Sequence, residues 1–154
     1  MQESFDSIDK KIINLLQENS NLSAKQVALE VGLSLTPTYE RLRRIENSGV
    51  INRYVALVDR KKVGKSLELF CQITLSKHQT EIFIDFEKKV VEFDEVMELY
   101  HIAGSYDYLV KIAVEDMDVY EDFIKNKIAS IKNIYNIKTS FVMNEIKYST
   151  AYKL

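Results

Sequence analysis

The sequence has little of several residues whose scarcity narrows the class of protein. Its 154 residues include one cysteine, one proline, four glycines and no tryptophan. The single cysteine, Cys71, excludes an internal disulfide and a cysteine-rich metal site. No stretch approaches the length of about 18 uncharged apolar residues that a membrane span needs, and residues 1–11 lack the apolar core of a signal peptide. We therefore expect a soluble cytoplasmic protein with no membrane partner.

Recognisable catalytic motifs are missing as well. The chain contains no P-loop, no GxGxxG motif and no serine, histidine and aspartate pattern typical of a nucleophilic triad. Two histidines and one cysteine fall short of the three or four protein ligands that zinc usually takes. We therefore predict a protein that is not an enzyme and that needs neither a metal nor a cofactor.

The net charge is small, but it is unevenly distributed. A net charge of −2 argues against a nucleic-acid partner only if the charge is evenly spread. Residues 1–63 carry ten Lys and Arg against eight Asp and Glu, whereas residues 64–154 carry eleven against fifteen. This asymmetry is typical of a protein with a nucleic-acid-binding module, although a solvated helix face would explain it equally well.

Three helices are predicted in the first half of the chain. Apolar residues at helical spacing between positions 8 and 16 predict a helix capped by Asp6 or Ser7. A second, short helix is expected to begin at a capping-box pattern in residues 23–26 and to end at Gly32. A third helix is expected to begin after Ser34 and to end at residues 48–49. A short helix, a glycine turn and a further helix form a helix-turn-helix motif.

The third helix is predicted to bury one face and to present the other to DNA. The side chains expected to face the core are Leu35, Tyr39, Leu42 and Ile45. The opposite face is basic and rich in hydroxyl groups, so it suits phosphates and the O6 and N7 atoms of guanine in the major groove. Residues 51–58 are β-prone and are expected to form a wing or a strand leading out of the domain, where Arg53 contacts phosphate or is an ordinary edge-strand charge. The DNA-binding candidates are Ser34, Thr36, Pro37, Thr38, Glu40, Arg41, Arg43, Arg44 and Arg53.

The second half predicts an alternation of strands and helices. Strands are expected at 67–75, 96–103, 108–114 and 134–146, and helices at 80–93 and 116–129. The order β-α-β-β-α-β is that of a ferredoxin-like domain. Helices on one face of the sheet leave the other face bare, and an exposed apolar face usually has a partner, so a dimer is expected. The aromatic residues expected on the bare face are Tyr100, Tyr108, Tyr135 and Phe141.

Several short motifs occur in an order and at spacings that cover the whole chain. They are residues 33–38 (LSLTPT), 41–46 (RLRRIE), 49–51 (GVI), 104–108 (GSYDY) and 139–142 (TSFV), with Lys147 downstream. In these motifs the chain resembles the Lrp/AsnC (leucine-responsive, feast/famine) family of prokaryotic transcriptional regulators. Two positions depart from the pattern: Glu40 stands where the family often has a basic residue, and Leu35 where it often has proline.

The resemblance implies an α+β fold with a winged helix-turn-helix followed by a ferredoxin-like βαββαβ domain of the RAM/AsnC type. The expected domains are a DNA-binding domain over 1–58, a linker over 59–66, and a ligand-binding and oligomerisation domain over 67–154. The implied function is sequence-specific transcriptional regulation on double-stranded DNA in the nucleoid, in response to an amino acid or a related small molecule. The implied assembly is a homodimer that forms higher oligomers, commonly octamers.

The resemblance also implies an effector site between C-terminal domains of neighbouring dimers. The candidate residues are His101, Gly104, Ser105, Tyr106, Asp107, Thr139 and Ser140. A glycine turn exposes backbone N–H groups that can hold a carboxylate, and Asp107 can pair with an α-ammonium group.

Simpler explanations of these residues stay open. Residues 104–107 also suit an ordinary hairpin turn, and Thr139 and Ser140 suit a plain strand. His101 can be a structural histidine, and Cys71 suits a small buried apolar position. His78 is expected to be solvated. Two other functions also stay open, namely an enzyme similar to sirohaem decarboxylases, in which His101 would be the residue of interest, and an amino-acid-binding oligomer without a DNA role.

Overall fold

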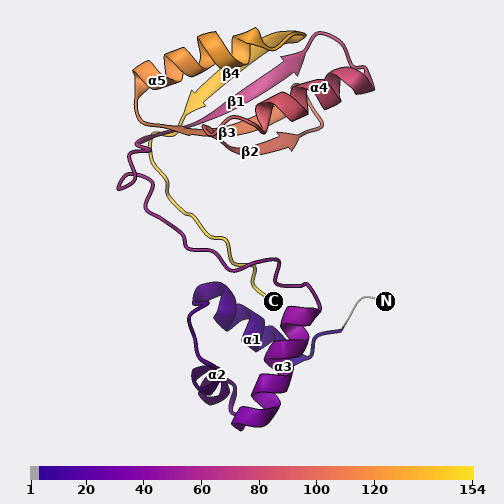
Figure 1. The fold of residues 1–154 in the computed structure, drawn as a ribbon, viewed down its shortest axis with the longest axis vertical. Coiled ribbons are helices and arrows are strands. Elements are labelled where there is room, and N and C mark those ends of the chain that lie inside the picture. Colours follow the sequence, from indigo (N-terminus) through magenta and orange to yellow (C-terminus); the bar gives the residue numbers. More distant parts are fainter. Residues whose placement is uncertain (1–3) are drawn as a thin grey trace. The chain divides into compact units, whose positions relative to one another are not determined.

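The computed structural model describes residues 4–154, and the chain forms two compact units (Figure 1). The first unit contains residues up to Leu57 together with Lys147–Leu154, and the second contains Val58–Ile146. The C-terminal residues therefore belong with the N-terminal helices, whereas the division expected from the sequence places them with the second domain. Within residues 4–154, no helix has the length and apolar character needed to cross a membrane.

The first unit is built on the three predicted helices, α1 (Ser7–Glu18), α2 (Ala24–Val31) and α3 (Leu35–Asn47). Asp6 caps α1 and forms a capping box with Asp9, and Ser23 forms the predicted capping box of α2 with Gln26. Gly32 ends α2 at a φ of 73°, a left-handed conformation that favours glycine. The fully buried side chains that join the helices are Ile12, Val27 and Ile45. The sequence pattern therefore determines these helices locally.

The β-prone segment 51–58 forms no strand, which corrects the expectation from the sequence. Among residues 4–154, no backbone hydrogen bond holds residues 52–58. A strand requires a neighbouring strand to complete its ladder, and within one chain this segment has none. Its apolar side chains stay largely in water, with Val55 57% and Leu57 62% exposed.

The C-terminal segment of the first unit is held by amide side chains of α1. Gln17 accepts from the Tyr152 N–H at 2.8 Å and donates to the Tyr152 carbonyl at 2.9 Å. Asn14 accepts from the Leu154 N–H at 3.3 Å. These hydrogen bonds fix an irregular segment that has no ladder of its own.

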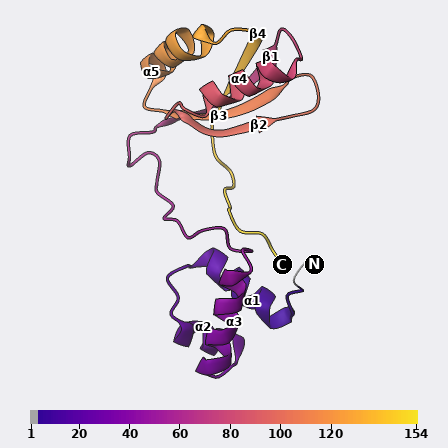
Figure 2. The same ribbon diagram turned by 45° about the vertical axis from the view of Figure 1, so that its right-hand side comes forward.

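The second unit is a four-stranded antiparallel sheet with helices on one face, seen from two directions in Figures 1 and 2. The strands are β1 (Leu67–Leu75), β2 (Val96–His101), β3 (Tyr108–Val114) and β4 (Ile134–Phe141), in the order β2-β3-β1-β4. The helices are α4 (Thr80–Val90) and α5 (Met117–Asp122), the latter continued by a π-helical turn (Phe123–Lys127) and a 3-10 turn (Ile128–Ser130). The predicted ferredoxin-like order is confirmed.

Three element boundaries differ from the expectation. Strand β2 ends at His101 and not at Ala103. Strand β4 ends at Phe141, which pairs with Leu69 near the start of its partner β1, and not at Ile146. The last cross-strand bond runs from the Val142 N–H to the Glu68 carbonyl at 2.9 Å. Helix α4 ends at Val90 and not at Phe93.

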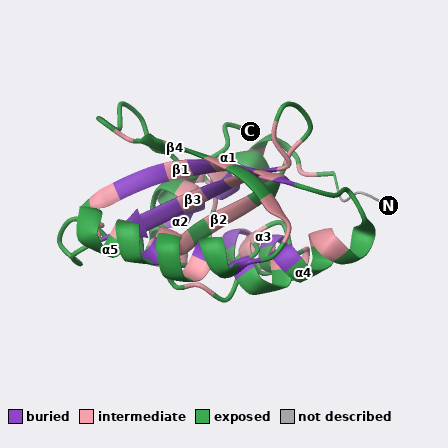
Figure 3. Ribbon diagram, turned by 90° about the horizontal axis from the view of Figure 1, so that it is seen from above, coloured by how far each residue is buried: buried purple, intermediate pink, exposed green. Residues whose placement is uncertain are grey.

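The core of the second unit lies between the sheet and the helices. Central strands β1 and β3 are buried over most of their length, whereas the outer sides of the helices are exposed (Figure 3). Two aromatic residues expected on the bare face belong to the helix face: Tyr108 is fully buried, and Phe141 makes an edge contact with Tyr120. Tyr100 and Tyr135 are exposed as expected.

Candidate functional site

The buried face of α3 differs from the predicted one. Ile45 is fully buried, but Leu35 is 54% and Tyr39 65% exposed. Thr38 is fully buried, and its hydroxyl donates a hydrogen bond to the Ser34 carbonyl at 2.9 Å. Its side chain is therefore not available to contact DNA. Helix α3 is thus rotated by part of a turn relative to the expectation.

Two of the predicted DNA-binding arginines are held within the protein. Arg41 contacts Asp9 at 2.6 Å and Asp6 at 2.7 Å, and Arg44 contacts the other oxygen of Asp9 at 2.5 Å. The carboxylate of Asp9 is buried, with 1% of its side chain exposed. These ion pairs connect α1 to α3, and the positive charge of both arginines is largely compensated.

The pairing also shifts protonation equilibria at the start of α1. The backbone N–H of Asp9 and the guanidinium of Arg41 together lower the pKa of Asp6 to about 2. Hydrogen bonds to the two carboxylates raise the pKa of Arg41. Asp6 and Arg41 therefore keep their charges at neutral pH.

The other candidates on α3 are solvent-accessible. Thr36, Glu40 and Arg43 are exposed, and Pro37 is half-buried. Ser34 stands at the N-cap position, as predicted, but its side chain makes no capping hydrogen bond. A face that combines a hydroxyl, a carboxylate and a guanidinium can meet both base edges and phosphates.

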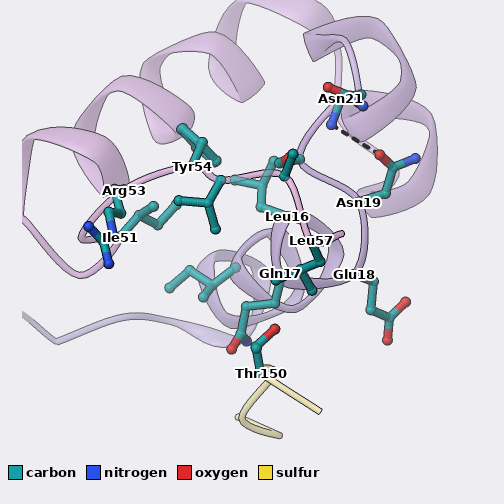
Figure 4. Close-up of a pocket in the computed structure, with 14 residues that line it drawn as sticks. Leu16, Gln17, Glu18, Asn19, Asn21, Ile51, Arg53, Tyr54, Leu57 and Thr150 are labelled. Carbon is teal, nitrogen blue, oxygen red and sulfur yellow. Dashed lines mark hydrogen bonds between the residues drawn. The ribbon is translucent and has the colours of Figure 1, made fainter. Parts of the chain in front are cut away.

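Arg53 lies at a pocket of about 470 Å³ within the first unit (Figure 4). The walls come from the C-terminal half of α1, the loop before α2, residues 51–57 and Thr150. Leu16 and Ile51 contribute apolar surface, and Gln17 contributes a polar edge. Arg53 is therefore placed beside α1 and not on the exposed face of α3.

The turn predicted to bind an effector is organised by Asp107. Its carboxylate accepts from the Leu75 N–H at 2.7 Å and contacts Nε2 of His78 at 3.0 Å. Its backbone donates to the Ile73 carbonyl at 3.0 Å and accepts from the Ile102 N–H at 2.8 Å. Asp107 thus connects the ends of three strands, which gives this carboxylate a structural role of its own.

The remaining residues of this turn are open to solvent. Gly104 has a φ of 143°, which favours glycine, and both it and Ser105 are exposed, while Tyr106 is half-buried. Neighbouring His101 stacks on Tyr108 with ring centroids 4.9 Å apart. His101 is exposed and also lies against Phe83, with ring centroids 5.0 Å apart.

Thr139 and Ser140 lie away from this turn within the protomer. Thr139 pairs with Cys71, four residues before Leu75 on β1, which is about 13 Å along a strand. Its hydroxyl accepts from Tyr120 at 2.8 Å and lies 3.4 Å from the Cys71 sulfur, on the helix-covered face. Burial raises the pKa of the Cys71 thiol. Ser140, the next residue, points to the bare face.

Two residues important for these sites escaped the prediction. Asp9 lies three residues after Asp6 and completes the capping box of α1. Its ion pairs with Arg41 and Arg44 leave no signal in the neighbouring sequence. His78 was expected only to be solvated; it is 63% exposed and yet bonded to Asp107. All three contacts join residues at least 29 positions apart in the sequence.

Family profiles match both halves of the chain. Residues 5–52 match a family described as winged helix-turn-helix DNA-binding. Residues 68–152 match the Lrp/AsnC ligand binding domain. The first match contains α1–α3, and the second contains all of the sheet except Leu67.

Individual proteins are similar to the chain over almost its full length. The DNA-binding transcriptional activator DecR of Escherichia coli strain K12 is 38% identical over 147 residues, which are 96% of this chain and 97% of the relative. The leucine-responsive regulatory protein of that strain is 34% identical, over 96% of this chain and 90% of the relative.

Two solved structures have nearly the same fold. An AsnC family transcriptional regulator from Agrobacterium tumefaciens has a TM-score of 0.91 and 40% identity, covering 96% of each chain. A transcriptional regulator from Neisseria meningitidis, solved in complex with L-Met, has a TM-score of 0.93 and 30% identity, covering 97% of this chain and 96% of that one.

Proposed function

This chain belongs to the Lrp/AsnC family of DNA-binding transcriptional regulators, and we propose that it acts by inserting α3 into the major groove of double-stranded DNA. The observation that carries the proposal is the division of α3 into two faces. One face packs on α1 through Ile45 and the ion pairs of Asp9. The other presents Thr36, Glu40 and Arg43 to solvent. We assign the principal basic contact to Arg43, because Arg41 and Arg44 are already paired with Asp9.

Arg43→Ala is expected to weaken DNA binding strongly. The loss is about 1–3 kcal/mol if the guanidinium reads guanine, and the log–log salt slope falls by about 0.9 if it binds a phosphate. Electrophoretic mobility shift on the sequence upstream of the protein's own gene, repeated at several salt concentrations, measures both. Lys88→Ala, which removes one exposed positive charge from α4, is the matched control. Unchanged affinity and slope in Arg43→Ala would exclude this face as the DNA-binding surface.

We also propose that an amino acid or related small molecule binds at the Gly104–Asp107 turn. The match of residues 68–152 to a ligand-binding domain and the L-Met complex of a 30%-identical neighbour support this assignment. The turn offers exposed backbone at Gly104 and Ser105 for a carboxylate, next to the carboxylate of Asp107 for an ammonium group. His101, Tyr106, Thr139 and Ser140 stay candidates whose contribution needs a neighbouring protomer.

Asp107→Asn is expected to abolish the effector response while leaving the fold intact, because its amide oxygen can still accept from the Leu75 N–H. Thermal-shift measurement with each of the twenty amino acids identifies the ligand in the wild type, since a ligand at 100 times its Kd adds about 2.7 kcal/mol of stability. The variant should melt near the wild-type temperature without ligand and should show no shift with it. A normal shift would contradict the role of the carboxylate.

We propose that the bare face of the sheet mediates homodimerisation, followed by assembly into higher oligomers such as octamers. Phe70 and Leu109 lie half-buried on this face, and no helix of the second unit covers them. An apolar sheet face that no helix covers is normally covered by a partner.

Leu109→Glu is expected to convert the oligomer into monomers, because a carboxylate would be desolvated without a partner at the interface. Analytical ultracentrifugation measures the change. Lys88→Glu on α4 introduces the same side chain on the helical side and should leave the mass unchanged. An unchanged mass in Leu109→Glu would place the interface elsewhere.

The proposed domains are a helix-turn-helix domain over 1–58, a linker over 59–66, and a ligand-binding and oligomerisation domain over 67–154. The segment 147–154 contributes to the first unit in space. We propose that the protein works in the cytoplasm, associated with the nucleoid, without a cofactor. We assign it no catalytic role, since the named relatives are transcriptional regulators.

A further inference from the structure

Large apolar side chains are exposed at the beginning of α3. Leu35 and Tyr39 are 54% and 65% exposed, and neither belongs to the apolar core that joins the three helices. They lie one helical turn apart and therefore share a face. Thr36 and Glu40, each one residue further on, extend the same exposed surface.

This surface is unsuited to phosphate. Leu35, Thr36, Tyr39 and Glu40 carry no positive charge, and the carboxylate of Glu40 repels phosphate oxygens. The basic side chains of α3 all come later, at Arg41, Arg43 and Arg44, and Arg41 and Arg44 are paired with Asp9. In a recognition helix the N-terminal residues meet base edges, and here the distribution of charge fits that orientation. The basic C-terminal half would then face the phosphate backbone.

We infer that Leu35 and Tyr39 read the 5-methyl groups of thymines in the major groove. Thymine is the only standard DNA base that presents a methyl group there, and apolar side chains recognise it by direct contact. Glu40, between them and the arginines, is suited to accept a hydrogen bond from the N4 amino group of cytosine. This inference rests on the proposed function and adds the class of sequence that α3 selects.

Replacement of thymine by deoxyuridine tests the inference, because it removes the methyl group and keeps every hydrogen-bonding group. The probe is the duplex most enriched by the wild-type protein from a random-sequence library, synthesised with each dT replaced singly by dU. We expect at least one position at which dU weakens wild-type binding about fourfold, the effect of burying one methyl group. Leu35→Ala or Tyr39→Ala should bind the dT and dU forms equally at that position.

Leu29→Ala provides the matched control, since Leu29 is an apolar residue of α2 that is 76% exposed. This variant should discriminate between dT and dU as the wild type does. Wild-type binding that is insensitive to dU at every position would overturn the inference. So would Leu35→Ala and Tyr39→Ala variants that keep the full discrimination, or that change the oligomeric mass and not DNA recognition.

The same experiment separates failure of this inference from failure of the proposed function. If the selected duplex is bound with the salt dependence of a DNA-binding protein but without sensitivity to dU, only the thymine assignment is wrong. If no duplex is enriched and none is bound, the proposed function and this inference both fall. All the substituted side chains are largely exposed, so circular dichroism should show folded variants in each case.

Discussion

Asp9→Ala is expected to destabilise the helix-turn-helix unit by about 3 kcal/mol and to abolish DNA binding with it. The buried carboxylate of Asp9 accepts from Arg41 and Arg44 and also from the Asp6 N–H at 3.1 Å. Removing one partner of a buried ion pair costs about 3–5 kcal/mol, because the remaining charge loses its compensation. The lower end applies here, since the side chain of Arg44 is 51% exposed.

Urea denaturation followed by circular dichroism measures this loss. Arg44→Ala is the matched comparison and should cost less, about 1 kcal/mol, because Asp9 keeps its pair with Arg41. The triple variant Asp9→Ala, Arg41→Ala and Arg44→Ala should regain part of the stability, since no guanidinium then stays without its counter-ion. A free energy of unfolding for Asp9→Ala within about 0.5 kcal/mol of the wild type would show that the ion pairs do not hold α3 in place.

Tyr108→Ala is expected to destabilise the second unit by about 3–5 kcal/mol. The ring is fully buried and lies at the centre of an aromatic cluster, 4.6 Å from Phe86 and 4.9 Å from His101 between ring centroids. Its hydroxyl donates to Glu87 at 2.7 Å. Because Tyr108 directly follows Asp107, collapse of this cluster should also remove the effector response. Thermal denaturation with and without ligand measures both effects.

Tyr108→Phe separates the ring from the hydroxyl and should cost only about 0.5–1.5 kcal/mol, the contribution of one hydrogen bond. This variant also tests how ionisation of the Tyr108 hydroxyl affects stability, since burial and then the bond to Glu87 raise the pKa of Tyr108 above its ordinary value. A raised folded-state pKa gives stability that is complete below about pH 10 and is lost as the pH rises through the folded value. The wild type should therefore lose stability above pH 10, and the Phe variant should lose less.

Tyr108→Phe is not expected to remove all of the stability loss at alkaline pH, because the pKa of Tyr54 is raised too. Burial and a hydrogen bond to Glu46 raise the pKa of Tyr54 as well, in the first unit. The slope of stability against pH in the Phe variant should therefore be reduced and not abolished. Identical slopes in the wild type and Tyr108→Phe would contradict the protonation behaviour ascribed to Tyr108.

Features that depend on neighbours within four residues along the chain were predictable. The cap at Asp6, the capping box at Ser23 and the helix end at Gly32 were all confirmed, because each depends on residues close in sequence. The alternation of strands and helices was also predictable, since burial of one face imposes a period on the apolar residues. The family resemblance added the function, which no local pattern carries.

Features that depend on distant partners were not predictable. Segment 51–58 has the composition of a strand and forms none, because a ladder needs a second strand that this chain does not supply there. Tyr108 and Phe141 were placed on the wrong face of the sheet, since the register between strands decides which way each side chain points. The contact of His78 with Asp107 joins residues 29 positions apart and depends on the pairing of β1 with β3.

The sequence by itself thus determined the helices, their caps, the order of strands and the family. Tertiary structure alone decided which arginines are available, because Asp9 sits on a different helix from Arg41 and Arg44 and pairs with both. Apolar and polar residues both lie on more than one side of α3, so helical periodicity does not decide which side is buried. Packing against α1 decides it. That packing buries Thr38, exposes Leu35 and Tyr39, and pairs Arg41 and Arg44 with Asp9 while Arg43 is exposed.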